Sequence, residues 1–245
     1  MRISERSVSK LVLVSIAVAM LALASSARGA VSLDAIITAD NHYALYTGNA
    51  SGSVVNFVGR NEVGLLGSEG GLNWNDAETY NVASMTDTHI YIAAWSDDLY
   101  AQGLLGEFHI NGIQLLTGDD GWQVYMTRED RDTGDPHPTE VELSAQIATA
   151  TAAGEWEEPF AGGNNGSAPW GMVDGITPDA LWTWIYGGPI NWPPSAHWLW
   201  RGGFVGYNPC EYLIFRRDVS DIPEPATIAL LAFGALPLLR RRKNA

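Results

Sequence analysis

LLGEFHINGIQLL, residues 104–116, is the stretch of sequence that decides the fold class. It holds two strand-like runs on either side of Asn111-Gly112, a dipeptide that favours the two-residue turns of β-hairpins. A hairpin joins antiparallel neighbours, whereas parallel strands need a long crossover connection. The stretch therefore predicts antiparallel β-structure in the middle of the chain.

Similar strand patterns recur on both sides of this hairpin. They are rich in β-branched and aromatic residues, or alternate in polarity, and turn residues separate them. The runs are residues 32–37, 42–47, 88–95, 122–127, 182–186, 198–200 and 211–217. This spacing is typical of sandwiches rather than of βαβ units. We expect an all-β fold, an antiparallel β-sandwich with one short helix.

The helix is marked by its two ends. Thr139 and Glu142 form a capping box, and Gly154 supplies the stop. Apolar residues between these caps fall on one stripe, which we expect to face the core. The stripe consists of Val141, Ala145, Ile147, Ala148 and Ala152.

Charge excludes one large class of functions. The chain of 245 residues has a formal net charge of −14, and residues 31–222 contain 26 acidic side chains, six arginines and no lysine. Such a body repels the phosphate backbone, so we expect no nucleic-acid partner. Cys210 is the only cysteine, which rules out an internal disulfide and a multi-cysteine metal site.

The N-terminal 30 residues have the three parts of a secretory signal peptide. Arg2, Arg6 and Lys10 precede an apolar run over residues 11–23, and small residues follow up to Ala30. This order is that of a segment which enters the Sec machinery and is then cleaved. An uncleaved anchor helix is the alternative.

The C-terminal residues 222–245 form a second targeting segment. Pro223-Glu224-Pro225 leads into an apolar stretch over residues 226–239, which ends in a basic cluster of Arg240, Arg241, Arg242 and Lys243. This tail resembles the PEP-CTERM sorting signal of Gram-negative bacteria: a Pro-Glu-Pro motif, one membrane helix and terminal arginines. The resemblance implies processing by an exosortase near the motif. A plain membrane anchor that nothing cuts is the alternative.

These segments divide the chain into a signal peptide (1–30), a sandwich body (31–221) and a sorting tail (222–245). We expect the protein to be exported, held transiently in the inner membrane, and then placed at the cell surface or in the extracellular matrix. Only the tail would contact the membrane, because the acidic body is not attracted to an anionic bilayer.

Two short patterns in the body resemble the jelly-roll β-sandwiches that accompany catalytic domains in secreted glycoside hydrolases such as α-rhamnosidases. One is Thr38-Ala39-Asp40-Asn41 followed by Tyr43-x-Leu45-Tyr46. The other is Ala180-x-Trp182-x-Trp184 followed by Ile214-Phe215-Arg216. The resemblance implies a fold more than a function.

Tryptophan is concentrated in the second half of the body. Flat aromatic rings stack on the apolar faces of sugars, while polar neighbours bind the hydroxyls. A glycan platform of this kind would consist of Trp182, Trp184, Asn191, Trp192, Trp198, Trp200 and Arg201. The alternative is that these tryptophans fill the core of the sandwich.

The sequence contains no catalytic constellation. Its many carboxylates follow turns, and no spacing selects an acid–base pair. The acidic loop at 130–135 departs from the calcium-loop order, which leaves a solvated turn and a calcium site as alternatives. His89 and His109 can share a sheet face, but no ligand set accompanies them. We therefore predict no catalytic residues, no metal and no cofactor.

The resulting expectation is an exported, non-catalytic protein of the cell envelope or the extracellular polysaccharide, with a sandwich that binds glycan. Two alternatives remain: a purely structural matrix protein, and a glycan hydrolase.

Overall fold

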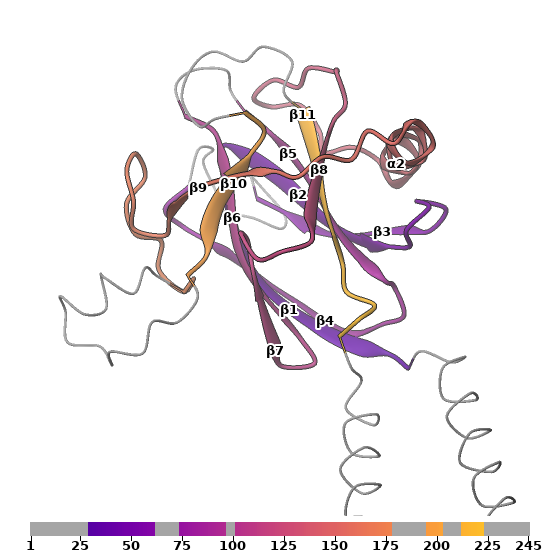
Figure 1. Cartoon of the computed structure of the whole chain (residues 1–245), viewed down its shortest axis with the longest axis horizontal. Helices are drawn as coiled ribbons and strands as arrows, with labels where there is room; N and C mark the ends of the chain where they lie inside the picture. Colours follow the sequence, from indigo (N-terminus) through magenta and orange to yellow (C-terminus); the bar gives the residue numbers. More distant parts are fainter. Residues whose placement is uncertain (1–28, 62–73, 97–100, 178–194, 203–211, 223–245) are drawn as a thin grey trace, which may run out of the picture. The chain divides into compact units, whose positions relative to one another are not determined.

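The computed structural model of the protein describes residues 29–61, 74–96, 101–177, 195–202 and 212–222 (Figure 1). Internal contacts divide the chain into Met1–Ala30 and Val31–Ala245, and every element described below belongs to the second unit. The predicted signal peptide and the sorting motif with its basic cluster lie outside the described residues, as does the expected strand over residues 182–186.

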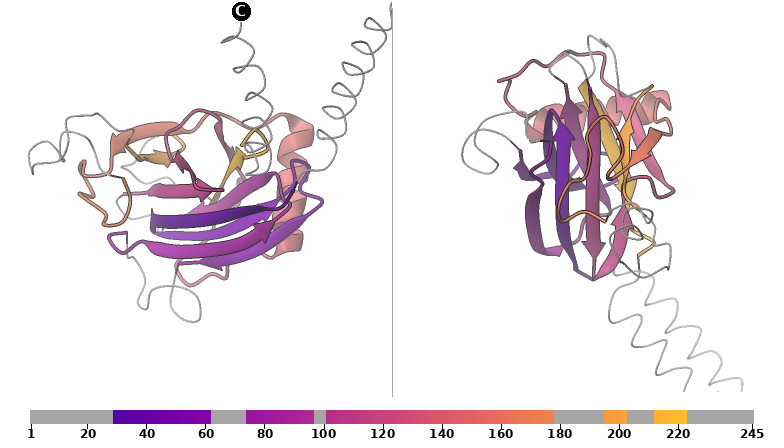
Figure 2. Two further views of the ribbon diagram at one scale, coloured as in Figure 1. Left: turned by 90° about the horizontal axis from the view of Figure 1, so that it is seen from below. Right: turned by 90° about the vertical axis from the view of Figure 1, so that its left-hand side faces the viewer.

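The described residues of the body form two antiparallel sheets and one helix, which confirms the predicted all-β sandwich (Figures 1 and 2). The first sheet has the order β4 (Glu78–Met85), β1 (Val31–Asp40), β6 (Gly103–Ile110), β10 (His197–Trp200) and β9 (Phe160–Asn164), with β7 (Ile113–Leu116) paired to β6. The second has the order β3 (Val55–Arg60), β2 (His42–Gly48), β5 (His89–Trp95), β11 (Tyr212–Asp218) and β8 (Trp122–Met126).

The hairpin at Asn111-Gly112 is present as predicted. It joins β6 to β7, with Ile110 paired to Ile113. Asn111 has φ 53° and Gly112 has φ 77°. Two successive positive φ angles are what the tightest hairpin turns require, and asparagine and glycine adopt them at the lowest cost.

The main core lies between the two sheets. Alternate residues of each central strand point inward, so that Leu33, Ala35 and Ile37 from β1 meet Ile92 and other apolar residues of the facing sheet. The opposite strand faces carry two further clusters, one on the outside of each sheet. This three-layer burial explains why the central strands β2 and β5 are buried along their whole length.

Helix α2 (Glu140–Ala153) covers the outer face of the second sheet (Figure 2). The capping box of Thr139 and Glu142 is formed, and Gly154 ends the helix in the left-handed conformation, as predicted.

The predicted buried stripe of this helix is wrong except at Ile147, which is buried. Val141 is 81% exposed, and the face that packs on the sheet consists of Leu143, Gln146, Ile147 and Ala150. Four alanines make both stripes weakly apolar, so the larger Leu143 and Ile147 decide which side is buried.

Three strands have no counterpart among the predicted runs, and all three are edge strands: β3, β4 and β9. These edge strands bury one face and expose the other, and their sequences contain fewer apolar residues than those of the central strands. In β4, polar or small residues occupy most exposed positions, and β9 contains two adjacent glycines. The pattern that identifies a central strand is therefore missing from their sequences.

Candidate functional site

Two of the expected platform tryptophans belong to the core. Trp198 and Trp200 are fully buried and, although two positions apart in β10, join different clusters. Trp198 stacks on Trp170, with ring centroids 4.1 Å apart, on the outer face of the first sheet. Trp200, at the end of its strand, lies between the sheets near Phe215. Neither ring is available to a sugar. For these two residues the structure therefore agrees with the alternative that the tryptophans fill the core, and not with a glycan platform.

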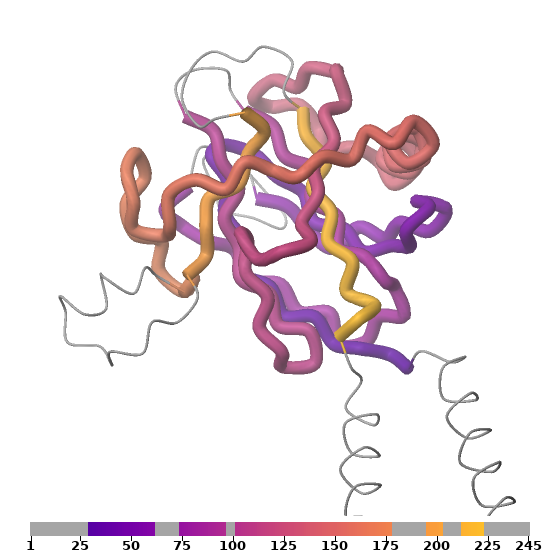
Figure 3. The backbone as a smooth tube through the Cα atoms, viewed as in Figure 1, coloured from indigo at the N-terminus to yellow at the C-terminus, as the bar shows by residue number. Residues whose placement is uncertain are grey.

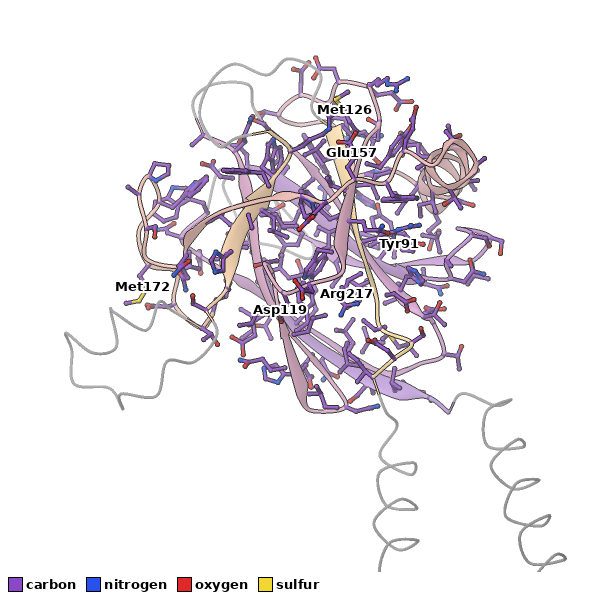
Figure 4. All side chains as sticks on the ribbon, in the orientation of Figure 1. Tyr91, Asp119, Met126, Glu157, Met172 and Arg217 are labelled. Carbon is purple, nitrogen blue, oxygen red and sulfur yellow. The ribbon has the colours of Figure 1, made fainter. Side chains whose placement is uncertain are left out.

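The remaining platform residues divide into two groups. Trp182, Trp184, Asn191 and Trp192 lie outside the described residues. The side chain of Arg201 pairs with Glu157, with Nε 3.1 Å from Oε2, and its Nη1 lies 3.2 Å from Sδ of Met126. Figure 4 labels Glu157 and Met126, which meet Arg201 near one end of β8.

Buried polar residues gather at one end of the sandwich. They stand where β1, β3, β5 and β8 end and where β2 and β6 begin: Asp40, Asn41, His42, Asn61, Ser96, Gln102 and Thr127. Asn61 links two strands, because its Oδ1 accepts from the Tyr43 amide and its Nδ2 donates to the Asn41 carbonyl, both at 2.7 Å. The indole of Trp170 donates to Oδ2 of Asp40 at 2.7 Å. The bonds of Asn61 satisfy backbone groups where the strands leave the sheets, and the bond to Asp40 anchors Trp170, so the first role of these bonds is structural.

A partly buried arginine, Arg131, holds the loop between β8 and α2 at the same end. The guanidinium of Arg131 lies 4.7 Å from the ring of Tyr212 and 5.9 Å from that of Trp95. It also pairs with Glu142 and donates to the Pro136 carbonyl. The arrangement fixes the loop on the sheet through cation–π and ionic contacts.

Glu107 is the centre of a polar network on the outer face of the first sheet. Its Oε1 accepts from His109 at 2.8 Å and Gln114 at 2.7 Å, and its Oε2 accepts from the amide and the hydroxyl of Thr177 at 2.9 and 2.7 Å. Burial alone would raise the pKa of Glu107, but these hydrogen bonds outweigh it and lower the pKa from its ordinary value. The carboxylate thus attaches the segment after β9 to the sheet.

The predicted sharing of a face by His89 and His109 is wrong. His89 begins β5 in one sheet, and His109 lies in β6 of the other. No group of three or more His, Cys, Asp or Glu side chains stands close enough to hold a metal ion within the described residues. In the acidic loop, the amide of Asp132 donates to Oδ2 of Asp135 at 2.8 Å, and the amide of Asp135 returns to the Asp132 carbonyl at 3.0 Å. This geometry is that of an aspartate-stabilised turn.

One side of the sandwich carries an acidic pocket of about 300 Å³, here called the side pocket. The connection from α2 to β9 crosses this side and pairs with β8 through Val124 and Glu157 (Figure 3). The residues that give the pocket its character are Asp119, Asp120, Trp122, Gln123, Glu158 and Leu199. Oδ2 of Asp119 accepts from the Leu116 amide at 2.7 Å, whereas the carboxylates of Asp120 and Glu158 accept no hydrogen bond from the described residues.

The positively charged side chain of Arg217 lies close to the side pocket. A Cβ added at Gly121 would stand 3.0 Å from the guanidinium of Arg217, which extends from β11 toward this turn (Figure 4). Glycine at 121, with φ 89°, therefore permits both the turn and the approach of the arginine.

The opposite side of the sandwich carries a larger hollow of about 680 Å³, here called the edge groove. It runs between β3 and β4, the edge strands of the two sheets. Near one end, Tyr80 packs against Gly59, where an added Cβ would stand 2.3 Å from the tyrosine ring. The lining is half apolar, and its only charged residue is Asp87. The apolar residues are Phe57, Val58, Val82, Ala83 and Met85, and the uncharged polar ones are Thr47, Asn56, Asn81, Ser84 and Thr86.

The described helix is too short and too polar to cross a membrane, and the apolar C-terminal stretch lies outside the described residues. Comparison of the chain with models of known families, with curated proteins and with solved structures finds no match.

Proposed function

We propose that the protein is exported, sorted by an exosortase and held at the cell surface or in the extracellular matrix, where its sandwich binds polysaccharide without catalysis. The observation that carries the proposal is the C-terminal order of Pro223-Glu224-Pro225, apolar stretch and basic cluster. Two prolines keep the motif extended, and the arginines hold the end of the chain on the cytoplasmic side. A tail of this design has a purpose only on an exported protein.

The structure supports the binding half of this proposal through its surface rather than its tryptophans. Both sides of the sandwich are hollowed and lined by amide, hydroxyl and carboxylate groups. Such groups match the paired donors and acceptors of sugar hydroxyls. The jelly-roll likeness drawn from the sequence agrees with a binding sandwich and adds no site of its own.

Replacing Pro223, Glu224 and Pro225 by alanine should leave the full-length protein in the inner membrane. The reason is that the transpeptidase loses the extended segment it recognises, while the apolar stretch and the basic cluster still anchor the chain. Cell fractionation and the apparent mass on a gel measure the result. Replacing Pro193 and Pro194 by alanine is the matched control and should leave sorting unchanged. Surface delivery of the triple variant at normal size would show that the tail is only an anchor.

A second candidate function, glycan hydrolysis, is favoured by the three carboxylates of the side pocket. Asp120 and Glu158 are exposed there, and acid–base cleavage of a glycosidic bond needs two carboxyl groups. Incubating the protein with its native matrix and measuring reducing ends separates the two candidates. We expect no release. A release that Asp120→Asn or Glu158→Gln abolishes would replace binding by hydrolysis.

A further inference from the structure

We propose that the edge groove binds one extended chain of a neutral polysaccharide, laid along β3 and β4. The inference rests on the proposed glycan-binding function and gives it a site and a class of ligand. Neither strand of the groove belongs to the tryptophan-rich half of the chain.

The first support is the hydrogen-bonding capacity that the groove leaves unused. The hydroxyls of Ser84 and Thr86 and the Oδ1 atoms of Asn56, Asn81 and Asp87 make no hydrogen bond to the described part of the protein. Hydroxyls both donate and accept, and the oxygens accept, so together they match a row of sugar hydroxyls. Val58 and Val82 lie between them, half-buried against the core, and offer an apolar surface to the C–H faces of the rings.

The second support is that the two asparagines and Asp87 are already held in place by hydrogen bonds. Asn56 donates from Nδ2 to Oδ2 of Asp87 at 3.0 Å, and the hydroxyl of Thr47 donates to the same oxygen. Asn81 is held in the same way by Asp34. A ligand that binds preorganised groups loses less side-chain entropy. The five β4 residues that line the groove span about 17 Å, enough for a short stretch of sugar chain.

The third support concerns what else an open strand edge can bind. A peptide or a second copy of this chain would add as a strand and needs a regular edge. Both edges are interrupted within the groove. Val58 is an extra residue between the pairs Leu45–Gly59 and Tyr46–Phe57, and Ala83 and Ser84 together oppose one residue of β1. Bulges of this kind twist an edge away from further pairing, whereas a sugar chain needs no two-residue register.

Charge selects the class of polysaccharide. The lining contains no Lys, Arg or His, and its one charged residue is Asp87. The chain as a whole carries a net charge of −14. A uronate-containing chain would therefore be repelled at the groove, and a neutral chain would not.

The test uses the full-length protein in a detergent that contains no sugar, with linear hexasaccharides as probes. Neutral gluco-, manno-, galacto- and xylo-hexamers are compared with the hexamer of galacturonate by titration calorimetry. We expect at least one neutral hexamer to bind and the galacturonate hexamer not to bind. Replacing both Asn56 and Asn81 by alanine should weaken the binding about tenfold or more, because each amide offers one or two hydrogen bonds to the ligand.

Asn164→Ala is the matched control. Asn164 lies in β9, the edge strand of the first sheet on the side opposite β4 and the groove. It should bind the neutral probe like the unmodified protein. Equal melting temperatures of all variants show that they are folded.

The possible contrary results are distinct. Neutral binding that survives the double replacement would overturn the groove assignment and leave the glycan-binding function standing. Preferential binding of the galacturonate hexamer would overturn the choice of a neutral ligand. Binding of no hexamer would overturn the inference, while retention of the protein on its native matrix tests the proposed function independently.

Discussion

Trp198→Ala lowers the free energy of unfolding by about 3–5 kcal/mol, the cost typical of truncating a large buried aromatic residue. The ring is fully buried and stacks on Trp170 with an interplanar angle of 19°. Its truncation leaves a cavity among residues that cannot close it, because β10 is paired on both sides. Denaturant unfolding followed by circular dichroism measures the change. Val141→Ala, on the exposed side of α2, is the control and should stay within about 0.5 kcal/mol.

The stacked pair also allows a test of what its two indole nitrogens contribute. Nε1 of Trp198 has no hydrogen-bond partner among the described residues, whereas Nε1 of Trp170 donates to Asp40. Trp170→Phe should therefore destabilise the protein more than Trp198→Phe, by about 1–2 kcal/mol, since only the first removes a hydrogen bond to a buried carboxylate. Equal costs of the two phenylalanine variants would show that the bond from Trp170 to Asp40 adds no stability. A small effect of Trp198→Ala would show that Trp198 is not held in the core.

Glu107→Gln should cost about 1.5–3 kcal/mol at neutral pH. The carboxylate accepts four hydrogen bonds, two on each oxygen, and an amide cannot accept on its nitrogen. The amide nitrogen of the new glutamine is a hydrogen-bond donor, and it would then face at least one of the donors of Thr177, Gln114 and His109.

The same variant should change the acid limb of the stability curve. The pKa of Glu107 is lowered in the folded protein from its ordinary value of 4.5. Its stabilisation is therefore complete above pH 4.5 and is lost as the pH falls through the lowered pKa. The stability difference between the two proteins should shrink over that range. Urea unfolding at several pH values measures it, with Glu158→Gln as the control at an exposed carboxylate. A difference that stays constant down to low pH would contradict the network.

Much of the fold could be predicted because its central elements carry local patterns. The hairpin at Asn111-Gly112 and the helix between Thr139 and Gly154 each depend on neighbours within a few residues. The edge strands β3, β4 and β9 could not be recognised in the same way, because they lack a clear local pattern and owe their conformation to the strand beside them. The buried face of α2 was also predicted wrongly apart from Ile147, because alanines lie on both sides of the helix and make its apolar pattern ambiguous.

The candidate sites were less predictable than the fold. The sequence shows that tryptophans are concentrated in the second half of the body. It does not show their packing, because the stack between Trp198 and Trp170 joins residues 28 positions apart. The edge groove brings Asn56 of β3 next to Asp87, 31 positions later. Neither residue is distinctive alone, and no spacing links them.

The sequence by itself determined the antiparallel class, the capped helix and the acidic charge, because each of these depends on composition or on residues close together in the chain. Only the tertiary structure decided which tryptophans are buried, which face of α2 meets the sheet, and where the body is hollowed. These features arise when the two sheets, the helix and the loops pack together, and that arrangement is set by burial of the whole core rather than by any local stretch.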